Sequence, residues 1–157
     1  MHERFERFCR VRCYGEMEPA DLINESLLIA YGKMDQLQSK EAFLSFLCGI
    51  SLRVLANNHR KKRPLTGASF LENRAQAETS SDLETEKHFL YEALGLLSTE
   101  QREAIILFEI TGFRIREIAE MQECSEDAVK QRLKRGRERL REILTFESIH
   151  QRGERHE

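Results

Sequence analysis

The densest group of residues that could do chemistry is a run of basic side chains near the end of the chain. Seven lysines and arginines fall between Lys130 and Arg141, although the whole sequence carries 27 acidic and 25 basic residues. Gathered ammonium and guanidinium groups attract phosphates. A solvent-exposed helix face would carry the same charges without any nucleic-acid partner, so the spacing of the neighbouring residues has to decide between the two interpretations.

The apolar residues around this run have helical spacing. After a Ser125 cap they recur on one face at about 100° per residue, and this face comprises Val129, Leu133, Gly136, Leu140, Ile143 and Leu144. A shorter helix at residues 114–121, with Ile115, Ile118 and Ala119 on its buried side, precedes it by one brief turn. Two helices in this arrangement predict a helix-turn-helix, which a merely solvated helix would not require.

In a helix-turn-helix, the first turns of the second helix enter the major groove of DNA. The polar residues there are the predicted DNA contacts: Ser125, Asp127, Lys130, Gln131, Arg132, Lys134 and Arg135. Arg137, Arg139 and Arg141 lie further along, where the helix should leave the groove. We therefore expect base contacts from the early group and phosphate attraction from the late group.

Composition excludes several classes of protein. No apolar run approaches the roughly 20 residues of a transmembrane helix, and the charged start "MHERFERFCR" does not fit a secretory signal. We expect a cytoplasmic protein with no membrane insertion. The sequence shows no catalytic constellation, phosphate-binding glycine loop or metal-ligand motif, so we predict no enzyme activity, no cofactor and no metal.

The four cysteines form no CxxC pair, and we expect them to be free thiols. Cys9 and Cys13 would share a helical face. A redox or metal sensor built on them and His2 would need a further ligand, for which His59 or Cys48 could serve.

The remaining periodicities predict an all-α fold, because proline and glycine are scarce and no stretch alternates like a strand. Pro19 suits the first turn of a helix whose apolar stripe is Leu22, Ile23, Leu27 and Ala30. Ser39 is the expected N-cap of the next, longer helix. That helix is apolar on two sides, which predicts that it packs between partners; the two sides are Phe43, Phe46, Leu47, Ile50 and Val54, and Leu44, Cys48, Leu52 and Leu55.

The predicted organisation is two small helical modules joined by a flexible linker. Residues 1–63 form the first module, residues 64–80 are rich in small and polar side chains and form the linker, and residues 147–157 are a C-terminal tail. The second module, residues 81–146, holds four helices at about 81–96, 99–110, 114–121 and 126–146. Ser-x-x-Glu/Gln capping boxes at Ser81 and Ser98 mark the first two starts.

Two long stretches resemble one protein family. "EALGLLSTEQREAIILFEITGFRIREIAEMQECSEDAVKQRLKRGRERLREIL" resembles the −35 reading module of bacterial RNA polymerase sigma factors, in particular of the extracytoplasmic-function branch of the sigma-70 family. "DLINESLLIAYGKMDQLQSKEAFLSFLCGISLRVLANNHRKKR" resembles the module of the same branch that binds core polymerase and opens the −10 element. The resemblance covers residues 5–144 in the order of the family.

The resemblance implies partners and further site residues. Asp21, Leu22, Asn24 and Glu25 stand where the family docks on the coiled coil of the largest polymerase subunit; the flap of the core enzyme is a second implied contact. Gln36, Leu37, Gln38 and Lys40, with Arg53 nearby, would capture a flipped base of the melted non-template strand. Arg60, Lys61 and Lys62, with Arg63, would hold phosphates. An anti-sigma protein is the other implied partner, besides promoter DNA.

Three positions depart from the family pattern. Leu37 replaces an aromatic residue, Phe46 replaces a tryptophan and Arg53 replaces an asparagine, so the −10 sequence cannot be transferred from relatives. The alternative function is a stand-alone helix-turn-helix regulator, which would bind operator DNA without polymerase and would have no use for "DLINE".

Overall fold

The computed structural model of the chain describes residues 1–62 and 82–154, with side chains described for residues 1–61 and 85–148. Within these ranges the regular elements are all helical, as predicted. They are α1 (His2–Arg12), α2 (Pro19–Gly32), a 3₁₀ turn (Met34–Gln36), α3 (Phe43–Lys62), α5 (Asp82–Gly95), α6 (Thr99–Ile105), a π-helical turn (Ile106–Ile110), α7 (Ile115–Met121) and α8 (Glu126–Glu154). The predicted linker and the Ser81 capping box lie outside the described residues.

Several predicted helix ends are confirmed. Pro19 opens α2, and Ser98 caps α6 by accepting the Gln101 N–H at 3.3 Å. The Ser39 hydroxyl also accepts an N–H, from Ala42, but α3 begins only at Phe43. The prediction that Ser39 caps α3 directly is therefore wrong, because Ser39 caps a turn that leads into the helix. The end predicted near residue 146 is also wrong: α8 continues to Glu154, since no proline follows Phe146 to stop it.

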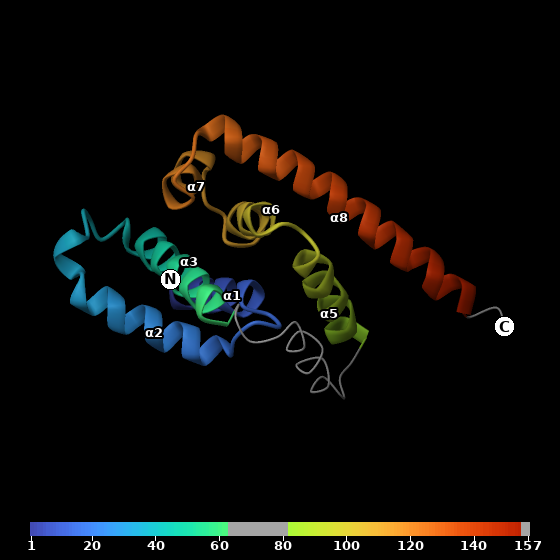
Figure 1. Cartoon of the computed structure of the whole chain (residues 1–157), viewed down its shortest axis with the longest axis horizontal. Coiled ribbons are helices and arrows are strands. Elements are labelled where there is room, and N and C mark those ends of the chain that lie inside the picture. Colours follow the sequence, from blue (N-terminus) through green and yellow to red (C-terminus); the bar gives the residue numbers. More distant parts are fainter. Residues whose placement is uncertain (63–81, 155–157) are drawn as a thin grey trace.

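The first three helices form a bundle in which each contacts the other two (Figure 1). Both predicted apolar sides of α3 are confirmed, since Leu47 and Ile50 on one side and Leu44 and Cys48 on the other are all buried.

The stripe predicted for α2 needs a correction. Leu27 is 42% exposed, and the buried positions are Leu22, Ser26 and Ala30, spaced four residues apart. Ser26 is tolerated in the core because its hydroxyl lies 2.8 Å from the hydroxyl of Ser51 on α3. A buried hydroxyl pair of this kind satisfies two polar groups at once and lets the helices approach closely.

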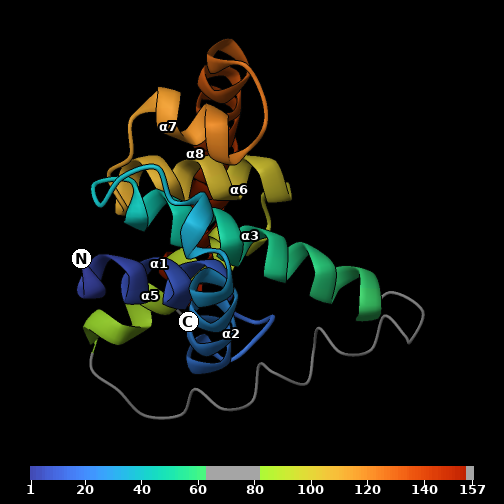
Figure 2. The ribbon, with the colours of Figure 1, turned by 90° about the vertical axis from the view of Figure 1, so that its left-hand side faces the viewer.

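Helices from the two ends of the chain pack on one another. Figures 1 and 2 both show α7 and the start of α8 on the far side of α6 from α1 and α2. The π-helical turn packs against α1, and α7 packs against α3. Arg4 of α1 donates to the Thr111 carbonyl after the π-helical turn, with Nε 3.2 Å from the oxygen, and its guanidinium lies 5.6 Å from the centre of the Phe113 ring.

The seat of α8 on α6 depends on a glycine. A Cβ added at Gly136 would lie 2.6 Å from Ile105 Cδ1, 3.3 Å from Ile105 Cγ1 and 3.4 Å from Gln101 Cβ. For α8 to keep this distance from α6, any residue with a Cβ would force the Ile105 side chain to shift.

We expect Gly136→Ala to destabilise the fold by about 1 kcal/mol, because overpacking outweighs the better helix propensity of alanine. Urea unfolding measures the change. Gly95→Ala is the matched control, since nothing lies within 4 Å of its added Cβ, and Ile105→Val should recover part of the loss by removing Cδ1. An increase in stability from Gly136→Ala would contradict the close packing.

Candidate nucleic-acid interface

The helix-turn-helix predicted from the sequence is present. The turn between α7 and α8 is closed by backbone bonds from Gln122 N–H to the Ile118 carbonyl, 2.8 Å, and from Cys124 N–H to the Ala119 carbonyl, 3.0 Å. Glu123 takes a left-handed conformation with φ 53°, at a position where glycine would be less strained. Ser125 then caps α8 by accepting the Ala128 N–H at 3.1 Å, so its hydroxyl is engaged in starting the helix.

The two faces of α8 are divided as its periodicity predicted. Val129, Leu133 and Gly136 are buried against the rest of the domain. On the opposite side of the first turns, five members of the predicted set are exposed: Asp127, Lys130, Gln131, Lys134 and Arg135. The Asp127 carboxylate lies 3.8 Å from Lys130 Nζ, a surface pair too weak to hold either side chain in place. This end of α8 therefore presents a polar, mainly basic surface to solvent.

Arg132 differs from its basic neighbours. Its side chain is only 20% exposed, and Nη1 donates to Gln122 Oε1 at 3.0 Å and to Cys124 Sγ at 3.3 Å. Nη2 lies 3.5 Å from the Glu100 carboxylate at the start of α6. Arg132 thus ties α8 to the turn before it and to α6. Its place directly before Leu133, at the border of the apolar stripe, was the one sequence signal of this role.

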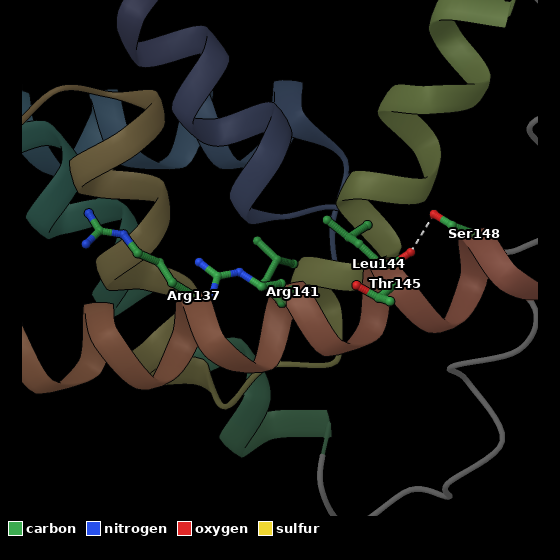
Figure 3. A pocket seen from close by; sticks show the side chains of 6 residues that line it. Arg137, Arg141, Leu144, Thr145 and Ser148 are labelled. Atoms are coloured by element: carbon green, nitrogen blue, oxygen red, sulfur yellow. Dashed lines mark hydrogen bonds between the residues drawn. The ribbon is translucent and has the colours of Figure 1, made fainter.

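The three arginines further along α8, Arg137, Arg139 and Arg141, also differ in their surroundings. Arg137 Nε donates to Glu109 Oε1 at 3.0 Å and its guanidinium lies 5.4 Å from the centre of the Phe108 ring, so Arg137 is already paired within its own domain although its side chain is 46% exposed. Arg139 pairs with Glu142 on the next turn, 3.2 Å away, and remains largely exposed. Figure 3 shows Arg137 and Arg141 on one side of α8, where they border an open hollow of about 360 Å³. Arg139 and Arg141 are therefore better placed than Arg137 to meet phosphates.

The residues expected to handle the −10 strand lie around the start and the middle of α3. Gln36, Gln38 and Lys40 are exposed and Leu37 is half-buried, while Arg53 is exposed on α3. Arg53 borders a hollow of about 250 Å³ together with Gln122, Glu123 and Arg132 of the helix-turn-helix. Arg60 and Lys61 are exposed at the end of α3, and the side chain of Lys62 lies outside the described residues.

The outer face of α2 carries a mixed acidic and apolar surface. Asp21, Asn24 and Glu25 are exposed, as a docking surface requires, whereas Leu22 is fully buried and packs inside the bundle. Sequence reasoning missed the apolar members of this face: Leu28 is 75% exposed, Tyr31 84% and Met34 46%, beside Leu27. Their signal was the spacing of three to four residues on a helix that already had another apolar side. Exposed apolar strips of this kind mark protein contacts.

The cysteines offer no support for a sensor. Cys9, Cys13 and Cys48 are free and buried. Burial, with a smaller effect of Cys13, raises the pKa of the Cys9 thiol to about 12, and burial raises the pKa of Cys13 to about 12 despite the nearby Arg12. Within the part of the chain that the structure describes, no cluster of three or more histidine, cysteine, aspartate or glutamate side chains could hold a metal ion. None of the described helices is long and apolar enough to span a membrane.

Comparisons with known proteins agree with this geometry. The family model "Sigma-70, region 4" matches residues 90–140, which include the helix-turn-helix. The extracytoplasmic-function sigma factor EcfG of Rhodopseudomonas palustris is 29% identical over 79% of this chain and 70% of its own length, and CarQ of Myxococcus xanthus is 27% identical over 79% and 73%. The sigma factor RpoE of Bartonella quintana, solved with the anti-sigma factor NepR, superposes with a TM-score of 0.72 at 26% identity, over 90% of this chain and 89% of that one.

Together these matches support an extracytoplasmic-function sigma factor. Its function is to direct transcription as an initiation factor, and the same comparisons favour this function over that of a stand-alone regulator. The likeness to RpoE extends over both halves of the chain, whereas a stand-alone helix-turn-helix would need to match only the second.

We expect Arg132→Met to weaken −35 binding of the sigma factor evenly, with the ranking of −35 sequences unchanged, because the Arg132 guanidinium is engaged with Gln122, Cys124 and Glu100. Losing its hydrogen bonds should also cost about 1 to 2 kcal/mol of stability. Binding of polymerase holoenzyme to a set of −35 variants, with thermal unfolding of the free chain, measures both effects.

The matched control is Lys130→Met, which removes a charge from the exposed face two residues earlier. That variant should leave stability almost unchanged. A changed ranking of −35 sequences for Arg132→Met would instead place Arg132 in the groove.

Proposed function

We propose that this sigma factor reads the −35 element with the first turns of α8 and the −10 element with the loop before α3, while α2 docks on core polymerase. The observation that carries the proposal is the set of exposed polar side chains at the start of α8, on a helix whose other face is buried. The proposed division into modules, residues 1–63 and 81–146 with a linker at 64–80, follows the sequence; residues 147–154 of the predicted tail 147–157 continue α8.

At the −35 element, Lys130, Gln131, Lys134 and Arg135 are the proposed contacts. A guanidinium fits the two acceptors of guanine and a glutamine amide fits adenine, so Arg135 and Gln131 are the residues suited to read bases. Asp127 would accept from a base amino group, while Ser125 and Arg132 would support the helix. Arg139 and Arg141 would add phosphate attraction that carries no sequence information.

At the −10 element, Gln36, Leu37, Gln38 and Lys40 would hold a base flipped out of the non-template strand, with Arg53 as a further contact. The exposure of Gln36, Gln38 and Lys40 supports this role, because these side chains are free to make the new contacts that must offset the few kcal/mol of unstacking a base. Arg60 and Lys61, and Lys62 by sequence, would hold phosphates of the melted segment.

For core binding, the proposed surface is the outer face of α2. Asp21, Asn24 and Glu25 would meet a basic coiled coil of the largest subunit, and the apolar strip of Leu27, Leu28 and Tyr31 would supply the buried centre of the contact. Buried aromatic anchors typically dominate such interfaces. Leu22 would hold α2 in place from inside the bundle.

We place the protein in the cytoplasm, assign it no catalytic chemistry, and propose contacts with the flap of the core enzyme. An anti-sigma protein is a further proposed partner, supported by the arrangement that this chain shares with RpoE in its complex with NepR.

The first test of the proposal is transcription from a −35/−10 promoter with purified core. We expect initiation only when chain and core are combined, because each reading surface is small. Tyr31→Ser should weaken core binding by about 2 kcal/mol, the cost typical of a buried aromatic anchor. Phe146→Ser, an exposed aromatic on α8, is the control and should bind core normally.

Initiation by core alone, or specific nanomolar DNA binding by the free chain, would sink the proposal. Equal core affinities for the Tyr31 and Phe146 variants would move the docking surface away from α2.

The second test separates base readers from phosphate contacts on α8. Arg135→Ala or Gln131→Ala should cost about 1 to 3 kcal/mol at the cognate −35 element and blur its preference. Arg139→Ala or Arg141→Ala should weaken binding evenly and lower its salt dependence. Transcription from cognate and scrambled −35 promoters at two salt concentrations distinguishes the groups. If the late arginines alone set the preference, α8 would have to dock in another orientation.

A further inference from the structure

The compact arrangement of this chain cannot read both promoter elements at once. Elements named −35 and −10 lie about 25 base pairs apart, or about 85 Å at 3.4 Å per base pair. The whole of α8, 29 residues, spans only about 44 Å. Yet Arg53, assigned to the −10 strand, borders the same hollow as Gln122 and Glu123 beside the recognition helix. The two reading surfaces therefore lie side by side and have to separate.

We propose that a latch of four charged residues, Arg12, Glu16, Arg102 and Glu103, holds the free chain in this closed, inactive arrangement and opens when core polymerase binds. The latch joins the end of α1 and the turn after it to α6. This inference rests on the proposed function, because only simultaneous reading of two distant elements on core polymerase requires opening.

The four side chains alternate in charge across the junction. Arg12 donates from Nε and Nη2 to Glu103 Oε1, at 3.0 and 2.7 Å, and from Nη1 to Glu16 Oε2 at 3.0 Å. Arg102 Nη1 donates to Glu16 Oε1 at 2.9 Å. Arg12 is 1% exposed, so its charge depends on partners from both sides of the junction. Each side thus contributes one arginine and one glutamate.

The buried polar atoms of the latch are only partly hydrogen-bonded, so the latch adds little net stability and can be released. Burial alone would raise the pKa of Glu16, but Arg12, Arg102 and His59 outweigh it and lower that pKa, so Glu16 is held as an anion. Arg102 Nε, by contrast, is buried without a hydrogen-bond partner among the described residues. Buried ion pairs gain little net free energy, because attraction is offset by lost hydration. Opening returns that hydration, so the ion pairs themselves add little to its cost; the remaining cost comes from separating α1 from the π-helical turn and α3 from α7.

The direct test reverses one charge of the latch. Glu103→Arg places a third cation beside Arg12 and Arg102, and it should enlarge the radius of gyration of the free chain in small-angle X-ray scattering. It should also bind core severalfold more tightly, because no closed state has to be opened first. Glu6→Arg is the matched control, since Glu6 pairs with His2 inside α1 at 3.9 Å. A folded Glu103→Arg chain with unchanged radius and core affinity would overturn the latch.

A second variant tests the need for opening without disturbing the charges. A Cβ added at Gly49 on α3 would lie 4.0 Å from Met121 Cγ on α7. Gly49→Cys and Met121→Cys, in a Cys124→Ser chain, can be joined as a disulfide by mild oxidation and released by reduction; the same chain without Met121→Cys is the control for any reaction of the native thiols. The crosslinked chain should lose transcription with core, and cleavage should restore it.

The two tests separate the latch from the proposed function. Uncrosslinked chain that directs transcription with core confirms the function whatever the latch does. Full transcription by crosslinked chain would show that opening is not needed and would overturn the inference. If neither form directed transcription with core, the proposed function itself would fail, whereas scattering and core affinity of Glu103→Arg would still report on the latch.

Discussion

The packing of α8 on α6 determines which side chains of this sigma factor can reach DNA. Gly136 lets the two helices approach so closely that an added Cβ would meet Ile105 at 2.6 Å. With that face fixed, helical geometry alone turns Gln131 and Arg135 outward, because their Cβ atoms point away from the buried stripe. The tie from Arg132 to Gln122 and Cys124 then fixes the recognition helix relative to the turn.

Periodicity was enough to predict this much of the site. The sides of α8 follow from a spacing of 3.6 residues, and the caps at Ser98 and Ser125 follow from local hydrogen bonding, which the chain decides within a few residues. The all-α fold and the two apolar sides of α3 were predictable for the same reason. What the sequence could not reveal depends on partners distant in the chain. In the sequence, for example, Arg137 is one more basic residue of the run. Only the fold shows that Glu109 and Phe108 lie beside it.

The misplaced stripe of α2 has the same cause. Leu27 is more apolar than Ser26, so a pattern based on side-chain polarity buries the leucine. The structure buries Ser26 because Ser51 of α3 satisfies its hydroxyl, and α2 rotates to leave Leu27, Leu28 and Tyr31 outside. A hydroxyl pair between two helices is invisible to the periodicity of either one. The rotation nevertheless matters for function, since it creates the apolar strip proposed to dock on polymerase.

A chain that must be stable both closed and open constrains the chemistry of its junction. A junction held by apolar packing alone would favour the closed form more strongly through burial, and it would expose a larger apolar surface in the open form. Arg12, Glu16, Arg102 and Glu103 pair when buried and are well hydrated when exposed, so they suit both arrangements. Arg4 also suits both forms, because its guanidinium lies over the Phe113 ring in the closed form and would be hydrated in the open form. From composition alone, charged residues are expected only to keep the chain soluble. Four of them form the latch that controls when the two reading surfaces separate.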